Sequence, residues 1–391
     1  MSLGLKANVD GSGAIQVGGT DAINLSTGLN ATFVQNANLP NTFGFKNRII
    51  NGDMKIDQRN AGASVTPTDG QYVLDRFNFG LSQASKLTAQ QSSTAPAGFV
   101  KSFLITSSSA YTVGSSERFL TTQAIEGLNI SDLAWGTASA AAVTLSFWVR
   151  SSLTGTFGGA LRNSALDRSY PFSYTISSAN TWEQKSVTIA GDTSGTWLTT
   201  NGVGIYLSFS LGSGSTVSNT AGAWAAGNFV SATGATSVVG TSGATFYITG
   251  VQLEKGSTAT SFDYLDYGRS LAQCQRYFSK SYDTSAAVGT ASTTNGIVTL
   301  KVSSNTVPSL EPYGCAFLPV TMRTAPTVTS YGFQGGSGKV SNYNTGTDLA
   351  ASSGETQYIG TNGFSVRNGS GGTVSTANFA VIFHYAASAE L

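Results

Sequence analysis

The chain has 391 residues, of which 21 are basic and 20 acidic, so its formal net charge is +1 and only 10% of its residues are charged. Because no block of lysine and arginine is present, nothing draws the chain over long range toward nucleic acid or an anionic membrane. No apolar run reaches the ~18 residues of a membrane-spanning helix. The amino-terminal residues also lack a signal-peptide pattern, so we expect a protein kept in a cytosol until something else releases it.

The composition also indicates the fold class. The 46 glycines and the many Ser, Thr and Asn residues suit short strands joined by turns, because glycine adopts positive φ and Ser and Asn bond locally to turn backbone. We predict an all-β protein. Its length exceeds one compact core, so about two or three domains are expected.

Residues 1–46 alternate weakly in polarity, and Gly-Gly and Thr-Gly separate their strand-sized pieces. They contain too few large apolar side chains to bury a core by themselves. We expect this segment to be either a flexible tail or a β element that neighbouring chains complete.

Charge is concentrated in "NRIINGDMKIDQRNAG", residues 47–62. Read with a period of two, the isoleucines and the methionine point one way and the charged side chains the other, which predicts a strand with one apolar and one charged face. The charged face carries Asp53, Lys55, Asp57 and Arg59, and Arg48 lies at its start.

A second charge lies in an apolar setting. Alternation in "YVLDRFNFG" places Asp75 on a face with Val73 and Phe77, where an unpaired carboxylate costs several kcal/mol. Asp75 therefore needs a partner, and the charged face offers Lys55 and Arg59. We predict structural ion pairs, as a ladder between adjacent strands. The residues in that ladder are Asp53, Lys55, Arg59 and Asp75.

Residues 47–262 read as one run of strands, with the clearest alternation at 143–150 and 203–211. About nine strands over roughly 210 residues predict a two-sheet sandwich of the jelly-roll type. The other strands are expected near 72–80, 99–106, 117–126, 169–176, 182–190 and 245–254.

A helix is expected in "SFDYLDYGRSLAQCQRYFSK", where Leu271, Cys274 and Phe278 share a face. Asp263 or Asp266 can cap its start. We predict a short helical connector over residues 263–284.

Strand patterns resume over residues 285–391, which is enough chain for a small C-terminal β-sandwich. A Gly/Ser/Asn-rich loop, "GFQGGSGKVSNYNTGTD", lies between its strands. Cys274 and Cys315 are too few for a disulfide framework or a metal cluster. We expect both to be small buried hydrophobes.

The sequence offers no catalytic set and no metal cluster. The one histidine, His384, has no adjacent cysteine or clustered carboxylate, so a structural or interface role is expected. No G-x-S-x-G elbow, Walker loop or dinucleotide fingerprint is present. Glycoside hydrolysis stays open because it needs only two carboxylates. The carboxylates near predicted strand ends or loops, which more often cap turns or form ion pairs, are Glu117, Glu126, Asp132, Asp167 and Asp192.

Binding is easier to motivate, because aromatic residues make up 10% of the chain. In turn-rich stretches, Tyr and Trp can stack on sugar faces while presenting a polar edge. The alternative for each is a core aromatic, which is the expectation for Trp148 and Trp182 within strand patterns. The ligand-binding candidates are Tyr170, Trp197, Trp224, Tyr331 and Tyr343.

Six motifs occur in order between residues 47 and 282. They are "NRIINGDMKIDQRNAG", "YVLDRFNFG", "TLSFWVRSSLTGTFGGALRN", "NTWEQKSVTIAGDTSGTW", "ITGVQLEKGSTATSFDY" and "RSLAQCQRYFSKSY". In this combination the sequence resembles tail fibres and related tail proteins of tailed bacteriophages, and "FHYAASAEL" is similar to the end of such fibres. The resemblance implies a carbohydrate-binding-module-like jelly roll displayed on the virion, commonly as a homotrimer.

The resemblance also implies a role for residues 1–46. "GAIQVGGTDAINLSTG" is similar to fibre-root sequences that attach to the tail and intertwine between three chains. The implied partners are therefore phage tail or baseplate proteins at the N-terminal segment, and host surface polysaccharide or lipopolysaccharide elsewhere. The implied location is the virion tail, after assembly in the host cytoplasm and release by lysis.

A structural calcium ion is a further implication, because the module's family frequently holds one between its first and last strands. Asp53 in "INGDM" stands at the matching position, and Gln252 or Glu254 lies on the closing strand. A hard cation prefers such oxygen ligands. Lys55 and Arg59 share the face of Asp53, however, so a salt-bridge ladder is favoured there and no cofactor is otherwise expected.

These observations favour a non-enzymatic tail fibre in which residues 1–46 join the virion and residues 285–391 present loops to host surface glycans. One alternative is a purely structural tail or collar component. The other is a glycan depolymerase.

Overall fold

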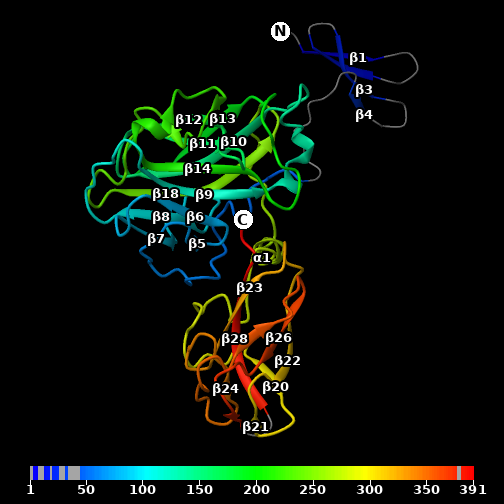
Figure 1. Ribbon diagram of the computed structural model, residues 1–391. Helices are drawn as coiled ribbons and strands as arrows, with labels where there is room; N and C mark the ends of the chain where they lie inside the picture. The colour runs from blue at the N-terminus through cyan, green and yellow to red at the C-terminus, as the bar shows by residue number, and fades with distance from the viewer. Residues whose placement is uncertain (1–2, 8–12, 18–19, 26–30, 34–44, 377–379) are drawn as a thin grey trace. The chain divides into compact units, whose positions relative to one another are not determined.

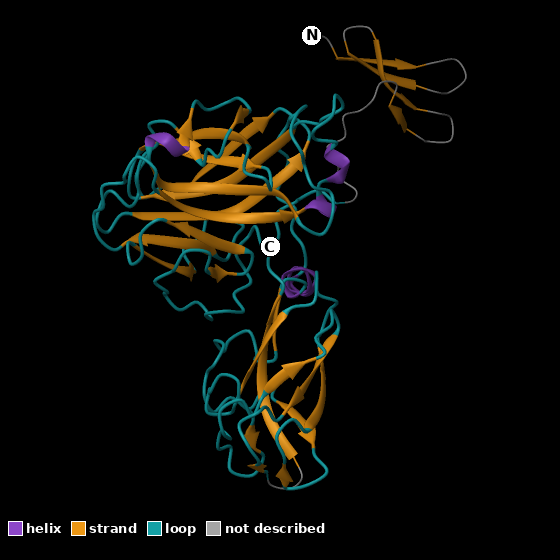
Figure 2. Ribbon diagram, viewed as in Figure 1, coloured by secondary structure: helices purple, strands orange, loops and turns teal. Residues whose placement is uncertain are grey.

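The structure is a computed structural model that describes residues 3–7, 13–17, 20–25, 31–33, 45–376 and 380–391. The chain divides into two compact units, Met1–Lys46 and Asn47–Leu391. Strands and loops make up nearly all of the described residues (Figure 2), so the all-β prediction is confirmed. None of the helices among these residues is long and apolar enough to span a membrane.

The first unit is an antiparallel sheet whose strands neighbour one another in chain order. Its strands are β1 (Leu3–Ala7), β2 (Gly13–Val17), β3 (Thr20–Leu25) and β4 (Ala31–Phe33). Attachment to a virion and intertwining between three chains stay predictions for this unit.

The second unit begins with the jelly roll, which has two antiparallel sheets of five and seven strands (Figure 1). The five-stranded sheet runs β13 (Glu183–Ile189), β10 (Val143–Ser151), β18 (Thr245–Lys255), β8 (Ser102–Ser107), β7 (Leu87–Ser92). The seven-stranded sheet runs β16 (Ala225–Ala226), β12 (Arg168–Ile176), β11 (Gly155–Arg162), β14 (Val203–Ser213), β9 (Arg118–Glu126), β6 (Phe77–Leu81), β5 (Tyr72–Leu74). The short strands β15 (Ser218–Asn219) and β17 (Ser231–Ala232) pair with each other in parallel.

The core of the jelly roll lies between the two sheets. Side chains from both inner faces are buried there, and Phe147 of β10 meets Phe209 of β14 edge to face at a centroid distance of 5.0 Å. Each fully buried phenylalanine contributes about 1.5–3 kcal/mol. The alternation predicted at 143–150 and 203–211 is therefore the pattern that builds this core.

The predicted strand at residues 47–62 is wrong. The segment is irregular, and Asn51 and Met54 both have φ of 59°, which no strand accommodates. The Asn51 side chain both donates to the carbonyl of Ile56 and accepts from its N–H, at 2.9 Å each, and so holds the turn. Gly52 is required because a Cβ there would lie 2.1 Å from the carbonyl oxygen of Val251 in β18.

The apolar side chains of this irregular segment still pack, but against the helix. α1 (Tyr267–Gln275) begins at its N-cap Asp266, whose carboxylate accepts from the N–H of Arg269 at 3.0 Å. Cys274 is fully buried beside Ile50 and Ile56, as expected. The helix ends before Phe278, and the chain continues into β19 (Phe278–Lys280).

The C-terminal β domain is organised around β28 (Ala380–Ser388), which has four antiparallel partners. These partners are β19, β20 (Val298–Lys301), β23 (Thr327–Tyr331) and β24 (Ser341–Asn342). A second sheet runs β22 (Pro312–Phe317), β26 (Gly363–Arg367), β25 (Glu355–Gln357), and β21 (Thr306–Val307) pairs with β27 (Val374–Ser375).

The burial predicted for Cys315 is wrong, because this cysteine is exposed. The register of β22 against β26 shifts between Pro312 and Gly314. Tyr313, within this shift, and Ala316 are buried, whereas Cys315 is exposed. A bulge changes which alternate residues reach the core, and the sequence pattern does not reveal it.

Candidate functional site

Three of the five predicted ligand-binding aromatics lie together in a packed cluster. Tyr170 and Trp197 are only 6% and 7% exposed. Trp224 lies with its ring centroid 5.2 Å from that of Tyr170 and 5.3 Å from that of Trp197. Trp135, which the sequence analysis did not single out, completes the cluster at 4.7 Å from Trp197. Rings packed edge to face in this way have little free surface for a sugar, so their place favours a core role.

The indole groups of this cluster are also tied to the loops around it. Trp197 donates from Nε1 to the carbonyl of Ser194 at 3.2 Å, and Trp224 donates to the carbonyl of Ala190 at 2.7 Å. These bonds satisfy the polar edge of each ring. The cluster therefore stabilises the loops that follow β13.

The other two aromatic candidates, Tyr331 and Tyr343, belong to the C-terminal β domain. Tyr331 is half-buried on β23, with its ring centroid 6.3 Å from that of Tyr282. Tyr343 is 48% exposed on the loop after β24. Of the five candidates, Tyr343 is the one whose ring is freely presented to solvent.

His384 lies close to Tyr331 in the fold and is 1% exposed. Its Nδ1 is 2.9 Å from Ser281 Oγ and its Nε2 is 2.9 Å from the carbonyl of Thr293. Its ring stacks on Tyr282. Burial lowers the pKa of His384, which favours a neutral structural histidine.

The predicted ion pairs form differently from a ladder between strands. Asp53 does pair with Lys55, at 2.8 Å. Arg59 instead pairs at 2.6 Å with Glu390 and lies 3.8 Å from the ring centroid of Phe278. The charges of the irregular segment therefore connect it to distant parts of the chain rather than to a neighbouring strand.

Asp75 has a neutral partner in place of the predicted cation. The backbone N–H and the side-chain amide of Gln58 donate to its two carboxylate oxygens at 2.6 and 2.7 Å. Burial raises the pKa of Asp75 to about 6, against the opposing charge of Arg59 and the hydrogen bonds from Gln58. The pairing was missed because the turns of the irregular segment place Gln58 beside Asp75.

The carboxylates considered for glycoside hydrolysis each have a structural partner. Two hydrogen bonds from Arg48 lower the pKa of Asp132. Burial acts to raise the pKa of Asp192, but hydrogen bonds from Arg168 together with other donors outweigh this effect, so the pKa of Asp192 is below its usual value. A glycosidase acid needs a raised pKa instead. Glu117 accepts from Tyr111, Glu126 from Arg276 and Tyr277, Asp132 from Arg48, Asp167 from Asn163, and Asp192 from Arg168.

The residues at the implied calcium position do not fit a cation. Glu254 accepts from the N–H and hydroxyl of Thr260 at 2.9 and 2.6 Å and from the amide of Gln252 at 2.9 Å. The carboxylate of Asp53 is paired with the ammonium of Lys55. Among the described residues, no group of three or more His, Cys, Asp and Glu could hold a metal ion.

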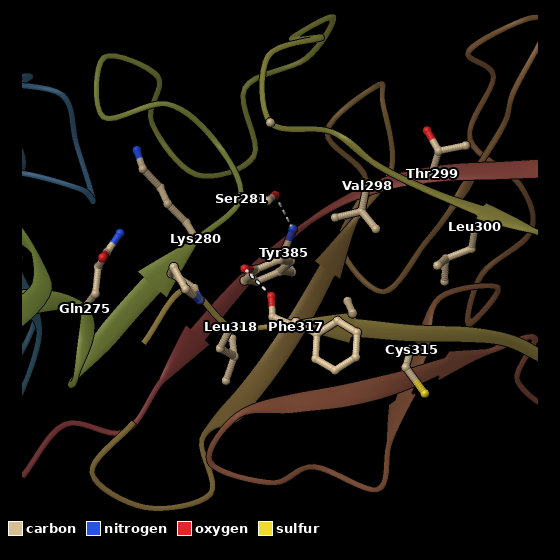
Figure 3. A pocket seen from close by; sticks show the side chains of 13 residues that line it. Gln275, Lys280, Ser281, Val298, Thr299, Leu300, Cys315, Phe317, Leu318 and Tyr385 are labelled. Carbon is tan, nitrogen blue, oxygen red and sulfur yellow. Dashed lines mark hydrogen bonds between the residues drawn. The ribbon is translucent and has the colours of Figure 1, made fainter. Parts of the chain in front are cut away.

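The C-terminal β domain contains an open hollow of about 580 Å³, which we call the C-terminal hollow. Its lining comes from β19, β20, β22 and β28 (Figure 3). Within the described chain, β20 and β22 each end a sheet, so each has one edge without a strand partner there. Gln275 and Lys280 lie at one end of the hollow in Figure 3, and Thr299 and Leu300 lie at the other.

The wall of the C-terminal hollow combines apolar and polar groups. Phe317 is 79% exposed, and Val298 and Leu300 are half-buried nearby. The hydroxyl of Tyr385 donates to the carbonyl of Phe317 at 3.3 Å. Burial lowers the pKa of Lys280 to about 8, and its Nζ donates to the carbonyl of Ala286.

This site was missed in the sequence because "GCAFLPVTM" reads as a core strand. An exposed aromatic ring beside half-buried aliphatic side chains makes this hollow a candidate binding surface. A volume of about 580 Å³ lies within the ~300–1,000 Å³ of typical ligand sites.

Neither a protein-family model nor a curated protein sequence matches the chain. Among solved structures, the enzymatically active domain of tailspike protein 4 of bacteriophage CBA120 is similar at 13% identity and a TM-score of 0.30, over 54% of this chain and 21% of that one. An arabinose-bound α-L-arabinofuranosidase has 14% identity and a TM-score of 0.28, over 51% and 26%. A family 11 carbohydrate-binding module of Clostridium thermocellum has 11% identity and a TM-score of 0.25, over 51% and 98%.

The chain thus spans about a quarter or less of the first two of these proteins. At such TM-scores the similarity assigns neither a family nor a function.

Proposed function

We propose that this protein is a receptor-binding tail fibre of a tailed bacteriophage that binds host cell-surface glycans without converting them. The ordered motifs between residues 47 and 282 support the phage tail origin. In this proposal residues 1–46 join tail or baseplate proteins, the chain forms a homotrimer, and the mature protein resides in the virion tail.

The observation that carries the glycan-binding part is the exposed ring of Phe317 in the wall of the C-terminal hollow. An aromatic face can stack on the apolar face of a sugar. Among the described residues, β20 and β22 each have an edge without a strand partner, where backbone N–H and C=O groups can bond to sugar hydroxyls. Apolar stacking together with neutral hydrogen bonds suits the uncharged sugar residues of a polysaccharide.

The non-enzymatic part is supported by the carboxylates themselves. Each of the five acids considered for hydrolysis is engaged by a structural donor, and hydrogen bonds from arginine lower the pKa values of Asp132 and Asp192. A depolymerase would need one of its acids to be protonated near neutral pH.

The test compares the full-length protein with Phe317→Ala on an array of bacterial surface polysaccharides and lipopolysaccharides. We expect the parent to bind at least one glycan and Phe317→Ala to bind it about tenfold more weakly, which corresponds to about 1.4 kcal/mol of stacking. The matched control is Tyr358→Ala, because Tyr358 is 87% exposed in the same domain but does not line the hollow.

Three results would contradict the proposal. Failure of the parent to bind any glycan would remove the adhesin function. Equal binding by the parent and Phe317→Ala would place the glycan elsewhere. New reducing ends in the bound polysaccharide would identify a depolymerase.

Point variants are preferable to deletion of residues 285–391. That deletion would remove Glu390, which pairs with Arg59 and Arg76 beside the jelly roll. A failure of adsorption after the deletion would therefore not distinguish loss of a binding surface from loss of stability.

A further inference from the structure

A second hollow, of about 180 Å³, lies on the outer face of the seven-stranded sheet. On β14, Ile205 and Leu207 point into the core, so Tyr206 between them points to the outer face. The hollow crosses β6, β9, β14 and β11. We call it the arginine hollow, and its lining includes Asp69, Asn78, Arg118, Arg162, Leu166 and Tyr206.

Arg162 is 6% exposed, yet its hydrogen-bond partners are neutral. Its guanidinium donates to Asn228 Oδ1 at 2.8 Å and to Ser208 Oγ at 3.0 Å. Its Nε has no hydrogen-bond partner among the described residues. Burial, together with the charge of Arg118, lowers the pKa of Arg162 to about 10. A buried cation that lacks an anionic partner is unfavourable.

The other buried arginines of the described chain are compensated. Arg48 pairs with Asp132, and Arg76 pairs with Glu390. Arg162 has no carboxylate within ion-pair distance in the same part of the chain. Arg162 is therefore the exception among the buried arginines of the described chain.

Arg118 brings a second guanidinium to the same hollow. It is half-buried and forms no ion pair with the described residues. The carboxylate in the lining is that of Asp69, whose Oδ1 accepts from the N–H of Leu81 at 2.8 Å. Two guanidinium groups against one carboxylate leave the arginine hollow with one net positive charge.

The remaining lining suits a sugar ring. Tyr206 presents an aromatic ring whose centroid lies 5.5 Å from Cζ of Arg162, and the amide of Asn78 can both donate and accept. A volume of about 180 Å³ is below the ~300–1,000 Å³ of sites for larger ligands, so one sugar residue is the appropriate size.

We propose that the arginine hollow binds the carboxylate of an acidic sugar residue, with Arg162 and Arg118 as the groups that hold it. This inference rests on the glycan-binding function proposed above. The planar carboxylate matches the guanidinium fork, and its single negative charge balances the net charge of the hollow. A phosphate group carries about −1.5 to −2 at pH 7 and would face Asp69, whereas a sugar hydroxyl can donate to that carboxylate.

The test titrates the full-length protein with galacturonate, glucuronate and N-acetylneuraminate, and with galactose and glucose as neutral counterparts. We expect at least one acidic sugar to bind at least tenfold more tightly than the neutral sugars, and added salt to weaken that binding. Inorganic phosphate forms a separate arm. Tighter binding of phosphate than of every acidic sugar, or no preference for acids over neutral sugars, would overturn the inference.

Two variants locate the site. Arg118→Gln is expected to weaken binding of the acidic sugar about tenfold. Asn228→Asp places a carboxylate next to the guanidinium of Arg162, and we expect this variant to fold like the parent. The new carboxylate competes with the carboxylate of the sugar, so binding of the acidic sugar should also weaken about tenfold. The charge-matched control for Arg118→Gln is Arg269→Gln, because the Arg269 side chain is 74% exposed on α1.

Unchanged binding in both Arg118→Gln and Asn228→Asp, with melting temperatures like that of the parent, would refute the site. That result is distinguishable from failure of the proposed function. Phe317→Ala would still bind the array glycan more weakly than the parent in that case, because Phe317 lies in the C-terminal hollow and not in the arginine hollow.

Discussion

The Glu390 carboxylate accepts a hydrogen bond at 2.6 Å from the guanidinium of Arg59, which lies 331 positions earlier in the chain. Arg76, 1% exposed, pairs with the other oxygen of the same carboxylate and stacks on Tyr277 at 3.6 Å. One carboxylate on the segment after β28 therefore neutralises two arginines beside β5. This contact ties the C-terminal β domain to the jelly roll within the second unit.

We expect Glu390→Gln to lower the free energy of unfolding by about 3–5 kcal/mol, because it leaves the buried Arg76 without an anion. Urea denaturation of the parent and the variant measures this directly. Glu355→Gln is the control, since the Glu355–Arg367 pair is more exposed, at 39% and 24%, and such pairs contribute about 0–1 kcal/mol. Equal losses in the two variants would contradict the role assigned to Glu390.

The raised pKa of Asp75 predicts a pH dependence of stability. The carboxyl of Asp75 binds its proton more tightly in the folded state, at a pKa of about 6 against 3.8 for the free group. Above pH 6 the buried carboxylate is charged, which lowers the free energy of unfolding. As the pH falls from about 6 to about 4 the carboxylate is protonated and the free energy of unfolding rises. The gain at low pH is at most about 3 kcal/mol.

Asp75→Asn removes this titration. The measurement is the free energy of unfolding of the parent minus that of the variant, at pH 7.5 and pH 4.5. We expect this difference to be larger at pH 4.5 than at pH 7.5, because protonation of Asp75 stabilises the parent alone. A difference independent of pH would show that Asp75 does not titrate in this range.

The aromatic cluster predicts that Trp197 acts in stability. Trp197→Ala is expected to lower the free energy of unfolding by about 3–5 kcal/mol, because the space it leaves beside Trp135 and Trp224 cannot fully collapse. Tyr343→Ala, at a ring that is 48% exposed, should change stability by less than about 0.5 kcal/mol. If Trp197→Ala weakened glycan binding without loss of stability, Trp197 would be a ligand contact instead.

The two cysteines should differ in reactivity. Burial raises the pKa of Cys274 well above its ordinary value, whereas Cys315 is exposed in the lining of the C-terminal hollow. We expect a thiol reagent to modify Cys315 alone in the native protein and both cysteines in denaturant. Cys315→Ser provides the control, and rapid labelling of that variant under native conditions would contradict the burial of Cys274.

The sequence pattern predicted the structure correctly where residues close in the sequence determine whether a side chain is buried or caps a helix. The alternation at 143–150 and 203–211 marks strands whose inner faces form the core, and Asp266 caps α1 as a helix-start residue should. Strand β11 was missed because its sequence, GTFGGALR, is rich in glycine. Glycine is ordinarily a weak strand former, but a Cβ at Gly159 would lie 2.3 Å from the carbonyl oxygen of Ser208.

The candidate sites were less predictable, because each depends on residues far apart in the sequence. Phe317 lies in a stretch that reads as a strand, and only the fold shows that its ring is exposed. The arginine hollow needs Arg118 and Arg162 to meet across β9 and β11, with β14 between them. For Tyr170 and Trp197 the sequence left both a ligand-binding and a core role open, and the fold buries both rings against Trp224.

By itself the sequence determined the class of fold and the spacing of its strands and helix, because side-chain alternation and turn chemistry act within a few residues. Only the tertiary structure decided which charges are compensated and which aromatic rings stay exposed. Burial and electrostatic energy depend on distance in space, and the chain positions that control them here are separated by tens to hundreds of residues.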